Sequence, residues 1–205
     1  MGTATGFWNW TAERYSRQGI ADEASYKKKL AITRKYLTPE SHVVEFGCGT
    51  GSTAVVHAPI VKSYHAIDVS EKMIEIARGK AVETGASNLT FTVGTLEEAG
   101  VADASCDAIL ALNILHLVPD LDGTLVTVAR MLEPGGYFVS STICLKNLTG
   151  SLRRLATAAR VLPLLPTIGS FSVEDLDARL RDAGFTIEES FEQAPGVVFR
   201  VAVRQ

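Results

Sequence analysis

From about Thr38 onward, short apolar runs typical of buried strands alternate with segments whose apolar positions recur at helical spacing. The strand-like runs are VVEF, YHAIDV, LTFTV, CDAILALN and GYFVSSTICL. A helix through Ala54–Ala58 is expected after the first run, the helix SEKMIEIARGKAVETG after the second, and shorter helical stretches between the later runs. This alternation predicts a parallel sheet with helices on both of its faces.

The segment after the second strand has the clearest helical pattern. Its apolar residues gather toward one side, namely Met73, Ile74, Ile76, Ala77 and Ala81. Ser70 can cap the start of this helix, and Glu71 suits its first turn, where a negative charge is favourable. We therefore expect a helix that begins directly after the second strand.

Both ends of the chain depart from this alternation. Two helices, about Trp8–Gln18 and Asp22–Leu37, are expected before the first strand. A helical insert over Leu152–Leu162, closed by Pro163 and Pro166, is expected after the fifth strand. These additions would surround the regular part of the sheet.

The C-terminal quarter predicts one more helix and a hairpin. Ser172 and Asp175 form a capping-box pattern at the start of SVEDLDARLRDAG, and Gly184 can end that helix. The last segments, FTIEESFEQ and VVFRVAVRQ, are joined across Ala194-Pro195-Gly196. Because the strands of a hairpin run in opposite directions, one of them must be antiparallel to the rest of the sheet. We expect that reversed strand near the edge.

Composition narrows the class of protein. The chain has 205 residues, 46% of them hydrophobic, which suits one domain with a sizeable core. A formal net charge of −3 argues against a nucleic-acid partner. Three widely spaced cysteines without a CxxC pair argue against a disulfide framework or a zinc site. Without a membrane-spanning run or a signal-peptide pattern, a cytoplasmic protein is expected.

Three glycines follow the first strand directly, in VVEFGCGTGST. Gly47, Gly49 and Gly51 allow the backbone to turn sharply and to approach a ligand closely, and the helix start that follows favours polar or anionic groups. A plain strand-to-helix turn needs only one or two glycines. The dinucleotide fingerprint G-x-G-x-x-G requires a glycine where Ser52 stands, which disfavours a nicotinamide-dependent oxidoreductase.

Asp68 ends the second strand, level with the glycine loop. A carboxylate at this place can accept hydrogen bonds from both hydroxyls of a ribose, and that role suits any adenosine ligand. Alternatively, Asp68 is an ordinary acidic residue at the start of the helix that follows.

Four segments together carry a resemblance: VVEFGCGTG, AIDVSEKMIEIAR, CDAILALNILHLVPD and LEPGGYFVSS. Over Thr38–Thr142 the chain resembles the class I S-adenosylmethionine-dependent methyltransferases. The resemblance implies a Rossmann-like, doubly wound, mostly parallel seven-stranded sheet with one antiparallel strand near the edge. It also implies a single domain over 1–205, with an N-terminal helical lid at 1–37 and a helical insert over the acceptor site at 146–171.

The resemblance assigns roles within this sequence. Glu45 would organise the loop and the methionine end of S-adenosylmethionine, Asp68 would bind the ribose, and Val69 and Met73 would line the adenine pocket. The loop residues expected to pack against the methionine end are Gly47, Cys48, Gly49 and Gly51. Where the family often has an acidic residue for the adenine amino group, this chain has Thr95. Leu96 can still offer its backbone N–H, and Glu97 is a candidate substitute.

The expected reaction is in-line displacement, in which the cofactor supplies both electrophile and leaving group, so neither a catalytic triad nor a metal is required. His116 is the candidate general base, with packing or loop support as the alternative, and Asn113 is a candidate contact for cofactor or substrate. Tyr15 resembles a lid residue over the cofactor. Trp8 and Trp10 suit the same role or simple packing of their helix.

The acceptor is a small molecule whose identity the motifs do not specify. Pro134–Val173 contains no acidic residue but holds Lys146, Arg153, Arg154 and Arg160 beside a stripe of Leu152, Leu155, Ala159 and Leu162. The stripe predicts either a helix packed on the core or a roof over an apolar acceptor that carries an acid group. Further basic residues in the N-terminal segment point the same way, namely Lys27, Lys28, Lys29, Arg34 and Lys35. A transient contact with an anionic membrane, without stable insertion, is the other use of such a surface. A non-catalytic S-adenosylmethionine-binding sensor or scaffold is the main alternative to an enzyme.

Overall fold

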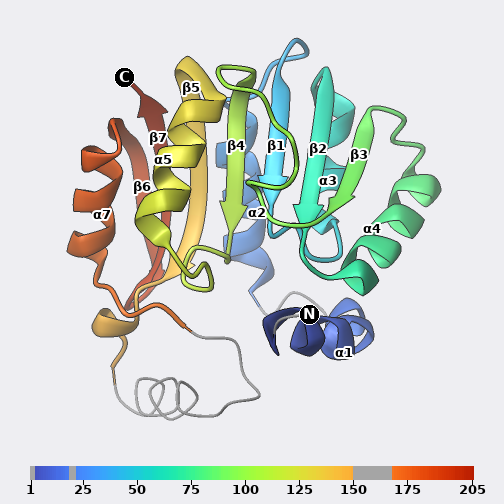
Figure 1. Ribbon diagram of the computed structural model, residues 1–205, viewed down its shortest axis with the longest axis horizontal. Helices are drawn as coiled ribbons and strands as arrows, with labels where there is room; N and C mark the ends of the chain where they lie inside the picture. The colour runs from blue at the N-terminus through green and yellow to red at the C-terminus, as the bar shows by residue number, and fades with distance from the viewer. Residues whose placement is uncertain (1–2, 19–21, 150–167) are drawn as a thin grey trace.

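The computed structural model describes residues 3–18, 22–149 and 168–205, and its centre is a seven-stranded sheet in the order β3-β2-β1-β4-β5-β7-β6 (Figure 1). The strands are β1 (His42–Phe46), β2 (Ser63–Asp68), β3 (Leu89–Val93), β4 (Cys106–Leu112), β5 (Leu132–Ile143), β6 (Phe185–Ala194) and β7 (Val197–Arg204). β7 is antiparallel to both of its neighbours, whereas the pairs among β1 to β5 are all parallel. The predicted sheet, with one reversed strand next to its edge, is confirmed.

Helices cover both faces of this sheet. α2 (Glu23–Arg34), α3 (Ser52–His57) and α4 (Glu71–Thr84) pack on one face, in a core that includes Ile32, Ala54, Ile74 and the strand residue Leu110. α5 (Leu121–Met131) and α7 (Val173–Asp182) pack on the other face through residues such as Leu125 and Leu176. Two short 3-10 helices, η1 (Ala58–Ile60) and η2 (Leu145–Asn147), follow α3 and β5 respectively.

The first helix, α1 (Thr3–Arg17), lies across the edge where the parallel strands end (Figure 1). The side-chain oxygen Oδ1 of Asn9 accepts hydrogen bonds from the Ser70 hydroxyl at 2.7 Å and from the Lys72 backbone N–H at 3.2 Å. Ser70 itself caps α4 by accepting from the Met73 N–H, as its sequence position predicted. These bonds fix α1 to the start of α4.

The segment between β3 and β4 departs from expectation. Short helical stretches were predicted between the later strands, but residues 94–105 form turns without a helix. Gly94 and Gly100 have φ values of 154° and 69°, which a right-handed helix does not accommodate. The predicted helix at Leu152–Leu162 lies outside the described residues.

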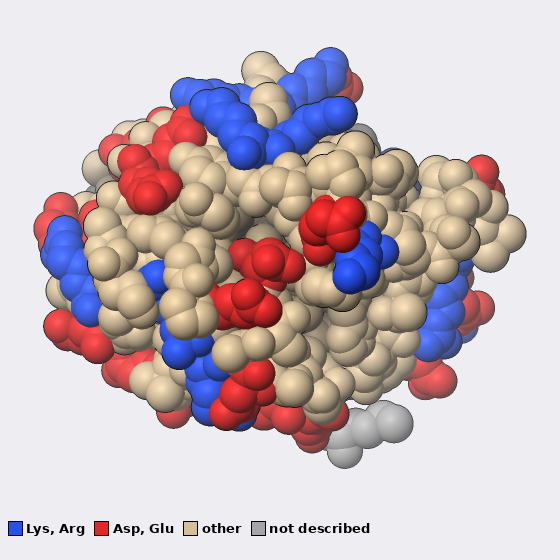
Figure 2. Space-filling model, turned by 90° about the horizontal axis from the view of Figure 1, so that it is seen from above, with Lys and Arg blue, Asp and Glu red and all other residues tan. Residues whose placement is uncertain are grey.

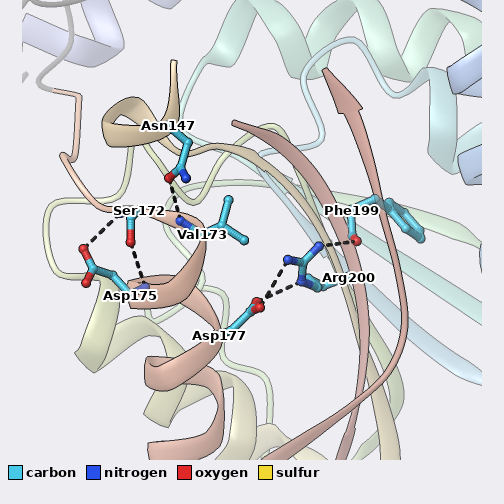
Figure 3. Close-up of polar contacts among 7 residues, drawn as sticks. All are labelled: Asn147, Ser172, Val173, Asp175, Asp177, Phe199 and Arg200. Atoms are coloured by element: carbon cyan, nitrogen blue, oxygen red, sulfur yellow. Dashed lines mark hydrogen bonds and ion pairs between the residues drawn. The ribbon is translucent and has the colours of Figure 1, made fainter. Parts of the chain in front are cut away.

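The chain on either side of that insert is tied together (Figure 3). Asn147 Oδ1 accepts the Val173 N–H at 2.9 Å, and Ser172 with Asp175 forms the predicted capping box at the start of α7. Arg200 on β7 donates two hydrogen bonds to the Asp177 carboxylate, at 2.8 and 3.2 Å. These contacts hold η2 and the sheet against α7.

The opposite edge of the sheet, where the parallel strands begin, has a mixed surface. Acidic and basic side chains are interspersed there over an otherwise uncharged surface, with one gathering of Lys and Arg (Figure 2). No single sign of charge dominates this face.

In the described part of the chain, no helix is long and apolar enough to cross a membrane.

Candidate functional site

A cavity of about 590 Å³ opens at the carboxyl ends of the parallel strands, a size typical of small-molecule sites. It lies where the strand order reverses between β1 and β4, the place at which open sheets of this kind bind ligands. Its wall is formed by α1, by the segments that follow β1 to β4, and by the first half of α5. The lining residues are Thr5, Trp8, Tyr15, Phe46, Gly47, Gly49, Asp68, Val69, Met73, Gly94, Thr95, Leu96, Glu97, Leu112, Asn113, Ile114, Leu117, Val118, Pro119, Asp120, Gly123, Thr124 and Thr127.

The three glycines of the loop differ in the space around them. Two leave no room for a side chain, and the third adjoins open space. A Cβ on Gly47 would lie 2.5 Å from the Ile114 side chain, and one on Gly51 would lie 2.8 Å from Ala77. A Cβ on Gly49, whose φ is 54°, would meet no atom within 4 Å. Gly49 therefore leaves an open cradle of backbone on the cavity wall.

Asp68 closes β2 beside this cradle. Its Oδ2 accepts the Gly49 N–H at 2.8 Å, and its Oδ1 accepts the Ser70 N–H at 2.9 Å. Burial raises the pKa of Asp68, and these two N–H donors oppose that effect. Each carboxylate oxygen can accept a further hydrogen bond, so the group is suited to a pair of neighbouring hydroxyls.

The wall beyond Asp68 is mostly apolar. Val69, Met73 and Leu96 line it, together with Thr95 and Glu97. The Thr95 backbone N–H is already bonded to Glu98 Oε2 at 3.0 Å, whereas Glu97 lies on the cavity wall. An adenine contact by Glu97 in place of the usual acid stays a prediction.

Several residues singled out in the sequence lie outside the cavity wall, among them Glu45, Cys48, Gly51 and His116. Glu45 is buried and accepts the Tyr64 hydroxyl at 2.9 Å, and burial raises the pKa of Glu45 to about 8. Burial also raises the pKa of the Cys48 thiol well above its ordinary value. Their predicted contacts with the cofactor stay predictions.

His116 is a buried residue of the loop that follows β4. Its Nδ1 lies 3.1 Å from the Thr142 hydroxyl, its backbone carbonyl accepts the Gly169 N–H at 2.7 Å, and burial lowers the pKa of His116 to about 4. These contacts support the packing alternative. A catalytic role for His116 stays a prediction.

The aromatic residues of α1 separate into two groups. Trp8 and Tyr15 line the cavity, whereas the Trp10 side chain is 80% exposed and does not. Asn113, predicted as a contact residue, lies on the wall at the end of β4.

Several lining residues were not singled out in the sequence, above all those that begin α5. Asp120 caps this helix by accepting the Gly123 N–H at 3.0 Å. It also lines the cavity, together with Thr124 and Thr127. Only the packing of α5 on the sheet turns these side chains toward the cavity, so no local motif marks them.

These residues fit an adenosine-bearing cofactor. The carboxylate of Asp68 can hold ribose hydroxyls, the open space at Gly49 admits a ligand next to the backbone, and the walls around Met73 and Leu96 are apolar enough for a purine. Among the described residues, no three His, Cys, Asp or Glu side chains gather into a set that could hold a metal ion.

Comparisons with known proteins agree with this geometry. Residues 37–184 match the model of a family described as a methyltransferase domain. A ubiquinone biosynthesis O-methyltransferase from Thiobacillus denitrificans is 29% identical over 72% of this chain and 65% of its own length. An uncharacterized methyltransferase from Bacillus subtilis, YcgJ, is 33% identical over 54% of this chain and 44% of its own length.

A comparison with solved structures agrees with the sequence relatives. The structure of an S-adenosylmethionine-dependent methyltransferase from Thermotoga maritima superposes with a TM-score of 0.73 at 23% identity, covering 98% of this chain and 99% of that one. The chain thus spans less than two thirds of the two curated relatives, but nearly all of this solved structure.

Proposed function

The chain belongs to the class I S-adenosylmethionine-dependent methyltransferases, and from this premise we propose that it transfers a methyl group to a small apolar acceptor. S-adenosylhomocysteine would be the second product. The observation that carries the proposal is the Asp68 carboxylate bonded to the Gly49 backbone on the wall of one cavity.

In the proposed pose, each part of the cofactor has its own wall. Asp68 would accept the ribose hydroxyls, while Val69, Met73 and Leu96 would enclose the adenine. The backbone at Gly49 would lie beside the methionine end, and Tyr15 and Trp8 would cover the cofactor from α1. The rest of the wall, from Asn113 to Thr127, is left for the acceptor.

The chemistry that S-adenosylmethionine supplies when bound is a sulfonium with an electrophilic methyl carbon. The contribution of the chain is alignment. Walls that fix both reactants replace a random encounter by an oriented one, which is worth orders of magnitude in rate. The apolar residues Leu117 and Val118 line the acceptor side, where a bound acceptor packed against them would displace water.

The apolar character of this end of the cavity supports an apolar acceptor. Leu112, Ile114 and Pro119 join Leu117 and Val118 in the wall next to Asn113. The relative from Thiobacillus denitrificans is named an O-methyltransferase, which supports an oxygen atom as the methyl acceptor. Of the basic residues predicted near the acceptor, Arg153, Arg154 and Arg160 lie outside the described part of the chain. Lys146 pairs with Asp175 at 2.7 Å.

A single-turnover assay tests the proposal. The protein is mixed with S-adenosylmethionine labelled in the methyl group and with a panel of phenols, carboxylic acids and their neutral analogues. Label should appear in at least one acceptor and S-adenosylhomocysteine should form in equal amount. Tight cofactor binding without transfer to any member of a broad metabolite extract would favour a non-catalytic binding protein instead.

A further inference from the structure

Lys29 of α2 is a buried cation. Its side chain reaches β5, where Nζ donates a hydrogen bond to the Ser141 hydroxyl at 2.8 Å, and the residue is 9% exposed. Among the described residues, no carboxylate lies within ion-pair distance of it, whereas Lys27 pairs with Glu23 at 3.2 Å and Lys35 with Glu189 at 3.3 Å.

Burying an ammonium whose hydrogen-bond partner is a neutral hydroxyl is costly, and burial lowers the pKa of Lys29, while the charge of Asp22, beyond ion-pair distance, opposes that effect. A buried charge is usually paired. Lys29 does not line the cavity, so its charge can act on a ligand only through the residues that lie between them.

The chemistry of Lys29 determines the direction of a chain of hydrogen bonds. An ammonium can only donate, so the Ser141 oxygen must accept from it. The Ser141 proton is then free to go to Asn113 Oδ1, which lies 3.0 Å away. The amide oxygen of Asn113 is therefore turned toward Ser141, and its N–H₂ group is left for another acceptor.

The backbone holds Asn113 in this place. Its N–H donates to the Ser141 carbonyl at 2.7 Å, and its φ of 62° is uncommon for a residue other than glycine. The next residue, Ile114, fills the space above Gly47, so the Asn113 amide lies on the cavity wall beside the glycine loop.

The strand order shows which end of the cavity this is. Asp68 lies on β2, and Leu96 follows β3. Asn113 follows β4, and Ser141 of β5 is paired with Leu112, the last residue of β4. The relay from Lys29 to Asn113 is thus at the opposite end from the proposed adenosine position. The proposed pose places the methionine end at Gly49 and leaves the wall from Asn113 onward to the acceptor, so we take the relay to face the acceptor.

We propose that Lys29, acting through Ser141, is a positioning residue that presents the Asn113 amide as a donor and favours an acceptor with an anionic oxygen, such as a carboxylate. This inference rests on the proposed function, because it takes the cofactor to occupy the Asp68 side. In this proposal Asn113 is the contact that determines specificity, and the charge of Lys29 strengthens the hydrogen bond that Asn113 donates.

The test compares benzoate with its neutral analogue benzamide, by titration calorimetry on protein saturated with S-adenosylhomocysteine. Lys29→Met should weaken benzoate binding about tenfold or more and leave benzamide nearly unchanged, since only the anion loses a charge-assisted interaction. Lys29→Arg should restore part of the preference. Lys27→Met removes the same charge from an exposed position of the same helix and should change neither affinity.

Ser141→Ala breaks the relay while leaving the ammonium in place, and it should also reduce the preference for benzoate. An unchanged ratio of the two affinities in both Lys29→Met and Ser141→Ala would overturn the proposal. So would absent benzoate binding at millimolar concentration in the unaltered protein. Weakened S-adenosylhomocysteine binding by Lys29→Met, with the benzoate preference intact, would assign the ammonium to the cofactor and overturn it as well. Failure of the unaltered protein to bind S-adenosylhomocysteine would instead contradict the proposed function.

Discussion

The Asp68 carboxylate accepts the backbone N–H of Gly49 at 2.8 Å, so the tip of β2 is joined to the glycine loop across 19 positions of sequence. The same carboxylate accepts the Ser70 N–H at the start of α4. One side chain thereby holds the loop, the strand and the helix in the arrangement that forms the cavity wall. A ligand that bonds to Asp68 meets a group already oriented by the protein, which lowers the entropic cost of binding.

Gly49→Ala is expected to weaken cofactor binding more than it weakens the fold. Alanine at a positive φ costs about 1 kcal/mol of stability, and the added Cβ would enter the open space beside the cavity. Gly85→Ala is the matched control, because its φ of 68° carries the same cost at the end of α4 and its Cβ also meets nothing. Both variants should melt at similar temperatures, but only Gly49→Ala should lose affinity for S-adenosylhomocysteine. Equal affinities in the two variants would show that Gly49 does not adjoin the ligand.

Glu45→Gln is expected to raise the stability of the ligand-free protein. The folded-state pKa of about 8 lies above the ordinary value of 4.5, so the contribution of Glu45 to stability is present at low pH and is lost as pH rises through 8. Glutamine is neutral throughout, so the advantage of the variant should grow by ~3 kcal/mol between pH 5 and pH 8. Urea unfolding across this range measures it, with the exposed Glu40→Gln as control. A pH-independent difference would mean that Glu45 is ionised in the folded state.

His57→Leu is expected to flatten the acid limb of the stability profile. Both ring nitrogens of His57 are buried and have no hydrogen-bond partner among the residues that the structure describes, and burial lowers the pKa of His57 from 6.5 to about 4. The neutral ring therefore contributes stability above pH 6.5 that is lost as pH falls toward 4. Between pH 7 and pH 4.5 the unaltered protein should lose ~2–3 kcal/mol more than the variant, with a similar loss from His116 still present in both. Parallel profiles would place the acid sensitivity elsewhere.

Much of the fold follows from local patterns. The capping box of Ser172 and Asp175, the cap at Ser70 and the turn at Gly196 each depend on residues within a few positions of one another, and alternating apolar runs determine the strands. The helix predicted between β3 and β4 is absent from the described structure, because the chain there forms turns in which Gly94 and Gly100 have positive φ angles.

In the candidate site too, some residues are marked by local motifs, whereas others depend on contacts between distant elements. The glycine loop and Asp68 are marked by motifs, and they lie together on the cavity wall. The bond between Lys29 and Ser141 joins positions 112 residues apart, and Thr127 reaches the cavity only because α5 packs on β5 and α7. No local spacing encodes such contacts, because they depend on how distant elements meet.

Asp177→Ala is expected to destabilise the protein strongly without touching the cavity. Arg200 is largely buried, and both of its hydrogen bonds to Asp177 join β7 to α7 (Figure 3). Removing the carboxylate leaves a buried guanidinium unpaired, which costs about 3 kcal/mol. Replacing Arg200 by Met in the same variant should recover most of that loss, whereas Glu75→Ala, which breaks the exposed pair with Lys72, should have no measurable effect. Chemical unfolding of the four proteins decides this, and a loss for Asp177→Ala no larger than for Glu75→Ala would contradict it.

The most direct test of the central claim is the affinity of S-adenosylhomocysteine for the unaltered protein and for Asp68→Ala, measured by titration calorimetry. Hydrogen bonds from two ribose hydroxyls to a carboxylate are worth ~1.5–3 kcal/mol, so the variant should bind about tenfold more weakly or worse. Asp103→Ala, which removes an exposed carboxylate far from the cavity, should bind as the unaltered protein does. If Asp68→Ala bound S-adenosylhomocysteine with unchanged affinity while remaining folded, the cofactor would not occupy this cavity as proposed.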